Sequence, residues 1–224
     1  MHRWLALVIG AQLLLWFTSG LVMSLLSIER VRGEHLVDRE QRLALPAGPY
    51  APVDAMLVQA GGAAKRIEHR MMLGRPVVEV ETGSGALRLF DARTANLLPP
   101  VDAAGARAIA LAAYKPKPSP AASVERVDRN STEYKGAVPA WRVALADAEN
   151  TRVYVSDTGR IAAVRTGTWR LYDFFWGLHI MDWSEHENFN TWWLKIFAFG
   201  GLALAIAGSV LLYFRWPRRR RKIA

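Results

Sequence analysis

The chain has 224 residues, of which 51% are hydrophobic and 22% are charged, and it contains no cysteine. The lack of cysteine excludes disulfide bonds, Cys-ligated zinc, iron–sulfur clusters and thiol catalysis. The formal net charge is +9, but seven of the 29 Lys and Arg residues lie at the two ends, which leaves 22 basic against 20 acidic residues. A nearly neutral middle with basic ends beside apolar segments indicates membrane topology, and not a nucleic acid as partner.

Two uncharged stretches are long enough to cross a lipid bilayer. Residues 4–26 form a first predicted transmembrane helix, whose length at about 1.5 Å per residue exceeds the roughly 30 Å hydrocarbon core. This stretch is longer than the apolar region of a secretory signal, and we expect an uncleaved anchor. The second predicted transmembrane helix covers residues 192–214, of which residues 196–214 are uncharged, and it begins with two interfacial tryptophans, Trp192 and Trp193.

The basic residues predict the orientation of both spans. Arg3 lies in the short N-terminal segment, residues 1–3, and an arginine cluster fills the basic tail, residues 215–224. By the positive-inside rule, both termini are expected in the cytoplasm and the central part in the periplasm. The sequence thus predicts a multi-pass protein of the bacterial inner membrane, with the lipid bilayer as its first partner.

Small residues recur along the second span at four-residue spacing. Gly201, Ala205 and Ser209 form one such row, and Ala203 and Ala207 form another. Small side chains at this spacing let a second helix approach closely. The approaching helix could be the first span, a second copy of this chain or another protein.

The central part divides into a linker and two similar units. Residues 27–52 are the predicted linker, which is rich in proline over residues 43–52. The first unit, residues 53–100, is predicted to open with a helix that has Val53, Leu57 and Ala60 on one face. Strands are then expected at residues 66–73, 76–81 and 86–90.

The second unit, residues 101–168, repeats this order. Asp102 is the expected N-cap of a helix over residues 103–114, with Ile109, Ala112 and Ala113 on its apolar face. Strands are expected at residues 123–129, 140–146 and 151–156. The strict alternation in residues 141–145 and 152–155 predicts one buried and one solvated face.

The two units can be superimposed at a constant offset. Residues 88–90 fall on residues 152–154, and Thr94 and Leu97 fall on Thr158 and Ile161, always 64 residues apart. Self-similarity at a fixed period indicates two copies of one small structural unit. We therefore predict an α+β fold in which two tandem units, each a helix with an antiparallel three-stranded sheet, lie between two transmembrane helices.

Several of these residues carry a resemblance to a known family. Ala-Trp-Arg-Val-x-Leu-x-Asp at residues 140–147 and the segment 151–161, with Gly159 in its turn, resemble a PepSY domain. The first copy is degenerate, because Ala95 replaces the turn glycine. His-Arg-Trp at residues 2–4 and Trp-Gly-Leu-His at residues 176–179 are similar to PepSY-associated membrane proteins, in their short two-span form. The resemblance implies a module found in protease propeptides, regulators and bacterial iron reductases.

An aromatic segment, residues 169–190, precedes the second span. Trp169, Trp176 and Trp183 recur every seven residues, which predicts an amphipathic helix in the outer membrane interface. These tryptophans are the candidate interaction residues. One interpretation is an aromatic belt that also docks the central domain, and the other is a site for chemistry.

Metal or haem chemistry would depend on histidines in this segment. If the helix continues, His179, Asp182 and His186 project from one face and could hold a divalent metal. His179 is also the candidate haem ligand, because the resemblance extends to haem-carrying siderophore reductases. His2 and His179 are expected a membrane thickness apart, so they cannot share one iron within a monomer. His35 and His69 are expected at the surface.

No catalytic motif of the common hydrolase, phosphate-loop or dinucleotide type occurs in the chain. We therefore expect a non-enzymatic periplasmic protein that binds or modulates another membrane or periplasmic protein, with no cofactor. The alternative is a haem- or metal-dependent accessory subunit in iron or siderophore reduction.

Overall fold

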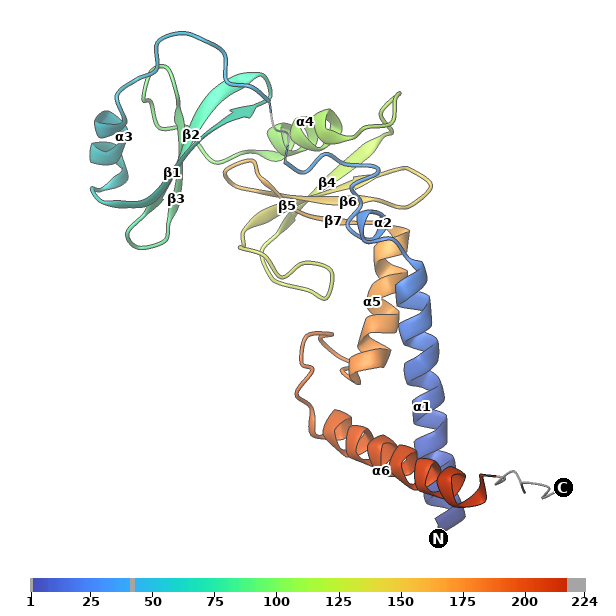
Figure 1. Ribbon diagram of the computed structural model, residues 1–224. Coiled ribbons are helices and arrows are strands. Elements are labelled where there is room, and N and C mark those ends of the chain that lie inside the picture. The colour runs from blue at the N-terminus through green and yellow to red at the C-terminus, as the bar shows by residue number, and fades with distance from the viewer. Residues whose placement is uncertain (1, 41–42, 217–224) are drawn as a thin grey trace, which may run out of the picture. The chain divides into compact units, whose positions relative to one another are not determined.

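The computed structural model describes residues 2–40 and 43–216, so the basic tail from residue 217 onward lies outside the described residues. The chain divides into two compact units. The membrane unit comprises residues 1–26 and 171–224, and the body comprises residues 27–170. Figure 1 shows the elements of both units.

The first half of the body is a helix packed on a three-stranded sheet. Helix α3 (Val53–Ala60) is followed by strands β1 (Ala64–Met72), β2 (Arg75–Thr82) and β3 (Leu87–Asp91), which pair antiparallel in the order β1-β2-β3. The predicted helix and strands are confirmed. Met56 lies on the predicted apolar face of α3 and is completely buried with Val78, Val80 and Phe90.

The second half of the body has one strand more than predicted. Helix α4 (Ala103–Ala113) precedes strands β4 (Ala122–Val127), β5 (Ala140–Leu145), β6 (Arg152–Ser156) and β7 (Ile161–Arg165), which pair antiparallel in that order. The Asp102 carboxylate accepts the Gly105 backbone N–H at 2.7 Å, as expected of an N-cap. The α+β class with two antiparallel sheets is confirmed, and β7 extends the second sheet.

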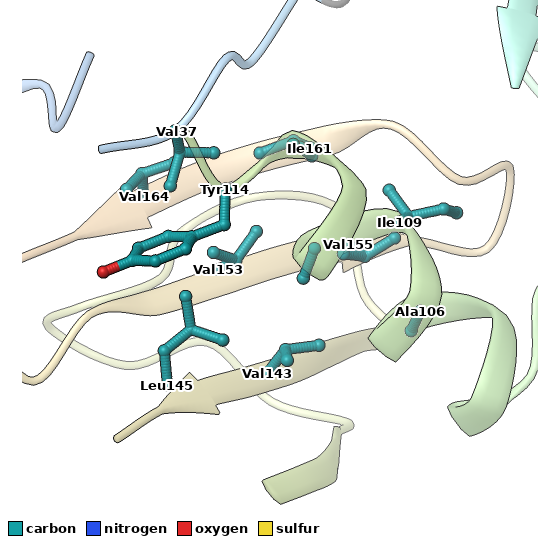
Figure 2. Packing of buried hydrophobic residues seen from close by; sticks show 12 residues of the cluster. Val37, Ala106, Ile109, Tyr114, Val143, Leu145, Val153, Val155, Ile161 and Val164 are labelled. Atoms are coloured by element: carbon teal, nitrogen blue, oxygen red, sulfur yellow. The ribbon is translucent and has the colours of Figure 1, made fainter. Parts of the chain in front are cut away.

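The core of this half lies between α4 and the sheet, as Figure 2 shows. Val143, Val153 and Val155 of the sheet form one buried cluster with Ala106 and Ile109 of the helix. The predicted apolar face of α4 was partly wrong, because Ala112 is exposed whereas Ala106 and Ala110 are buried. In an alanine-rich helix, hydrophobic periodicity is too weak to define the rotation of the buried stripe.

The opposite face of this sheet is also covered, so the predicted solvated face was wrong around Tyr154. Tyr134, from the connection between β4 and β5, stacks on Tyr154 with ring centroids 4.6 Å apart and planes within 5°. Both rings are buried together with Ala140 and Ala163. The Tyr134 hydroxyl donates to the Ala137 carbonyl at 2.7 Å, which holds the connection in place.

The turn of the internal repeat has a left-handed backbone conformation in both copies, although Ala95 stands in the first copy where Gly159 stands in the second. Ala95 adopts φ 58° and Gly159 adopts φ 79°, at the same offset of 64 residues. After its turn, the first copy pairs only Phe90 with Leu97, whereas the second copy continues into β7. A left-handed alanine costs conformational energy that glycine does not. The degenerate first copy therefore keeps the turn but reduces the fourth strand to one bridge.

Part of the predicted linker belongs to the body's core. A short helix, α2 (Ile28–Val31), leads to Val37, which is 1% exposed and bridges to Tyr114 at the end of α4. Gly33 with φ 73° fits against β7, because a Cβ there would lie 2.7 Å from Val164 Cγ1. The first part of the predicted linker therefore packs against the second sheet.

A buried cluster of charges joins the two halves of the body. Glu79 of β2 is 1% exposed, and its two carboxylate oxygens accept the Arg160 Nε–H at 2.7 and 2.9 Å. Arg66 and Arg70 of β1 approach the same carboxylate at 3.3 and 3.5 Å. Since Arg160 lies in the turn between β6 and β7, this cluster ties the first sheet to the second.

The membrane unit contains two helices long and apolar enough to span a bilayer. These are α1 (His2–Leu25), with its apolar part from Ala6 to Leu25, and α6 (Trp192–Arg215). Gly200 and Gly201 lie against Ile9 and Leu13, where an added Cβ would come within 2.9 and 3.0 Å of the side chains. Gly200 and Gly201 therefore allow helix α1 to approach α6 closely at this point.

Candidate functional site: the aromatic segment before the second span

The helix of the aromatic segment ends earlier than predicted. Helix α5 covers Gly167–Ile180, and Met181 adopts φ 55°. The Asp182 N–H donates to the Gly177 carbonyl at 3.1 Å, and the Met181 N–H donates to the Leu178 carbonyl at 3.4 Å. This is a Schellman termination, in which glycine usually occupies the left-handed position. Because methionine occupies it here, the sequence offered no stop signal, and the predicted helix over residues 169–190 was wrong beyond Ile180.

Asp182 organises the loop that follows α5. Its carboxylate accepts the backbone N–H groups of Ser184, Glu185, Glu187 and Asn188 at 3.0 to 3.3 Å. The hydrogen bond from Asn188 lowers the pKa of Asp182 far below its usual range; burial opposes this, and the other backbone donors reinforce it. Asp182 is therefore an anionic backbone anchor, not an available metal ligand.

His186 fastens the same loop to α5. Its Nδ1 lies 2.7 Å from the Asp173 carboxylate, and its carbonyl accepts the Trp176 indole N–H at 2.9 Å. The ring covers Gly177, where an added Cβ would lie 2.6 Å from the imidazole. Glycine at this position is thus required by the close approach of the histidine ring.

His179 contacts the first span instead of the loop. Its Nδ1 lies 3.0 Å from the Ser19 hydroxyl, and its carbonyl accepts the Trp16 indole N–H at 2.8 Å. The ring also lies beside Gly20, where an added Cβ would be in ordinary van der Waals contact with His179 Cε1 at 3.5 Å. Trp16 thereby satisfies one of the last carbonyls of α5, which have no partner within the helix.

The predicted metal site does not assemble from these three residues. His179 contacts α1 and His186 covers Gly177, and positions 177 and 179 lie on different faces of a helix. Asp182 is occupied by backbone donors. Within residues 2–40 and 43–216, no group of three His, Asp or Glu side chains is arranged to hold a metal ion. The two imidazoles likewise do not converge on one haem iron, and the side chain of His2 lies outside the described residues.

The three predicted interaction tryptophans have different environments. The Arg165 guanidinium lies 4.2 Å from the centroid of the Trp169 ring, and the Trp176 indole N–H donates to the His186 carbonyl. Trp183 lies in the loop and is 66% exposed, as is Phe189 at 63%. The seven-residue spacing therefore does not produce one stripe, and Trp183 alone of the three presents most of its surface. Phe189 was missed because it lies between two asparagines, Asn188 and Asn190, in a polar stretch.

Two polar features of the body were also missed. His35, expected at the surface, is partly buried and lies 3.0 Å from the Glu149 carboxylate. Burial raises the pKa of Glu149, but His35, Thr166 and Thr168 together lower it below its usual range. A polar cleft of about 1070 Å³ lies between residues 32–40, strand β1 and the turn at Gly159. Lys115 also lines the cleft, so four segments distant in sequence form it and no local pattern marks it.

The comparisons with known proteins concern the whole chain. The family model described as "PepSY-associated TM region" matches residues 1–224. No curated protein and no solved structure matches the chain. The match agrees with the two long apolar helices that bracket the α+β body. The chain therefore belongs to the PepSY-associated transmembrane family.

Proposed function

We propose that this membrane protein is non-enzymatic and binds another membrane or periplasmic protein, whose activity it modulates. In this proposal the chain lies in a bacterial inner membrane, with both termini in the cytoplasm and the body in the periplasm. The basic residues at both ends of the chain support that orientation.

The observation that carries the proposal is the exposure of Trp183 on an ordered loop. Asp182 and Trp176 hold this loop by hydrogen bonds to its backbone, and the His186 side chain pairs with the Asp173 carboxylate, although the loop has no regular secondary structure. A large aromatic residue on a prearranged loop loses little conformational entropy on binding, which is typical of residues that dominate interface energy. This environment favours recognition by Trp183 over a purely structural role.

The proposal is tested by crosslinking and co-purification from native membranes, with Trp183→Ala as the variant. The expected result is loss of a reproducible partner at unchanged expression. Trp4→Ala is the matched control, because Trp4 is also an exposed tryptophan of the membrane unit. Recovery of the same partner with Trp183→Ala would contradict the proposal.

The orientation is tested separately with a cysteine introduced at Asn130, an exposed position of a chain that has no natural cysteine. An impermeant maleimide added to cells with a permeabilised outer membrane should label this cysteine but not one placed at Ala224. Labelling at Ala224 alone would reverse the topology.

The second candidate is a haem-dependent accessory role, for which His179 is the residue at issue. Ser19 engages its Nδ1, and hydrogen bonding at one ring nitrogen is how proteins orient an imidazole that ligates through the other. Purified membranes would then show a Soret band that His179→Ala removes. A colourless preparation of normal yield would leave the binding role as the sole proposal.

A further inference from the structure

Strand β1 forms the open edge of the first sheet. The order β1-β2-β3 leaves β1 with a neighbour on one side, and no backbone group among the described residues pairs with its other side. The outer edge of β3 is covered instead, because the Leu98 N–H donates to the Leu89 carbonyl and the Asp91 N–H donates to the Asn96 carbonyl. The first sheet can therefore accept a further strand at β1.

The register of the sheet identifies the backbone groups that point outward from β1. Met71 pairs with Pro76, whose carbonyl accepts the Ala92 N–H on the far side of β2. In an antiparallel ladder, a pair that exchanges no hydrogen bonds directs its backbone groups away from each other. The N–H and C=O groups of Met71 therefore point outward, as do those of His69 and Ile67 at every second position.

The polar cleft of about 1070 Å³ opens on this edge. Met71 lines the cleft from one face of β1, whereas Glu68 and Arg70 line it from the other face, because side chains alternate along a strand. A cleft lined from both faces runs along the edge between them. Its volume is at the upper end of the roughly 300 to 1,000 Å³ that is typical of ligand sites.

The side chains of the cleft do not select an ion. Among the described residues, five basic and four acidic side chains line it, so their charges nearly cancel. Arg39 and Lys115 already donate to backbone carbonyls of the body. The outward backbone groups of β1 remain available, and they repeat at the spacing of a strand. An extended polypeptide presents donors and acceptors at that same spacing.

The shape of the cleft favours a single segment over a second copy of the whole sheet. Residues 32–40 and 159–161 form its opposite wall. A strand that pairs with β1 lies about 4.8 Å from it, and a sheet continuing beyond that strand would meet this wall. The occupant that fits is therefore one extended stretch of polypeptide.

We propose that the open edge of β1 binds an extended segment of a partner polypeptide, which joins the first sheet through the backbone groups of Ile67, His69 and Met71. In strand addition, main-chain hydrogen bonds give the affinity, and contacts of alternate side chains give the specificity. This inference goes beyond the proposed function, because it assigns a second binding surface, separate from the loop that carries Trp183.

The first experiment measures amide exchange in the full chain, labelled with ¹⁵N-histidine in nanodiscs. The His69 amide resonance is identified by its absence in His69→Val. In the free protein this amide should exchange much faster than that of His179, which lies within helix α5. The probe is a capped heptapeptide of alternating valine and threonine. At ten times its Kd the probe should slow His69 exchange about tenfold, because about a tenth of the molecules remain unbound.

The comparison peptide carries N-methyl groups on two adjacent central residues. Neighbouring N–H groups of a strand point to opposite edges, so this peptide cannot pair through either edge. It should leave His69 exchange unchanged. This comparison uses the unaltered protein and does not depend on how any variant folds.

A pair of variants isolates the backbone donor of β1. His69→Pro removes an N–H that points away from β2, so the pairing of β1 with β2 is kept. His69→Val also removes the imidazole but keeps the N–H. His69→Pro should bind a fluorescein-labelled probe at least about fivefold more weakly than His69→Val, which corresponds to one net hydrogen bond. Fluorescence anisotropy gives both affinities.

Three results would overturn the inference. The first is a His69 amide that is protected without peptide, which means that the edge is already paired; if dilution removes the protection, the occupant is a second copy of the chain. The second is a probe that slows exchange no more than its N-methylated form. The third is equal affinity of His69→Pro and His69→Val. Trp183→Ala should bind the probe normally, so retention of the native partner by that variant contradicts the proposed function alone.

Discussion

Removal of the Glu79 carboxylate should destabilise the body more than any comparable change on its surface. Glu79 is 1% exposed and contacts Arg160 at 2.7 and 2.9 Å, with Arg70 3.5 Å away. In Glu79→Ala these partly buried guanidinium groups keep their charge but lose their shared acceptor. Loss of one member of a buried ion pair costs about 3 to 5 kcal/mol. Glu68 remains 2.7 Å from Arg160, so we expect a value near the lower end, about 3 kcal/mol.

Glu81 is the matched control on the same strand. It is 31% exposed and touches Arg66 at 3.4 Å, an arrangement that contributes at most about 1 kcal/mol. For a body of this size, 1 kcal/mol corresponds to about 2 to 4 °C in Tm. We expect Glu79→Ala to lower the Tm by about 10 °C and Glu81→Ala by no more than about 3 °C.

The assay is thermal and urea unfolding of the full chain in detergent, followed by tryptophan fluorescence. The slope of unfolding free energy against urea should be the same for both variants, so that the midpoints compare stability directly. Equal midpoints for Glu79→Ala and Glu81→Ala would refute the argument that the buried cluster holds the two halves together.

Three further predictions concern backbone and loop. Gly159→Ala should cost more than about 2 kcal/mol in urea unfolding, because φ is 79° and the added Cβ would lie 2.6 Å from Met72 Sδ. Ala95→Gly should instead stabilise by about 0.5 to 1 kcal/mol, since it relieves a left-handed alanine; a loss of stability would contradict the repeat geometry. For Asp182, the pKa is lowered on folding, so its stabilisation is complete at neutral pH and declines as the pH falls below about 4. Asp182→Asn should remove that acid dependence and raise amide exchange over residues 184–188 at pH 7, whereas unchanged exchange would refute its role as anchor.

Features with a local cause were predictable. The two spans follow from apolar length, and helices α3 and α4 of the body follow from periodicity and, for α4, from the Asp102 N-cap. Strands β5 and β6 follow from alternation, and strands β1 to β4 follow from strand-like runs between turn residues. Strand β7 was missed because two of the central residues of Ile161–Arg165 are alanine, which carries little strand signal.

The candidate site was less predictable than the fold. The seven-residue spacing identified Trp183 as one residue of a helical stripe. Helix α5 ends at Ile180, however, so Trp183 lies in the following loop, where it is exposed. His179, Asp182 and His186 were grouped on one face, and each was found with another partner. A single backbone angle at Met181 separates the two arrangements, and side-chain identity alone rarely specifies a left-handed methionine.

The amino-acid sequence by itself determined the order of elements, the two apolar helices and the duplication, because these depend on neighbouring residues and on period. The tertiary structure decided where α5 ends, which half of the linker enters the core and how the two halves of the body are joined. Val37 and Glu79 illustrate the reason: each is buried by residues far away in the sequence, Tyr114 for one and Arg160 for the other. Burial of this kind has no local signature, since it exists only after distant segments have come together.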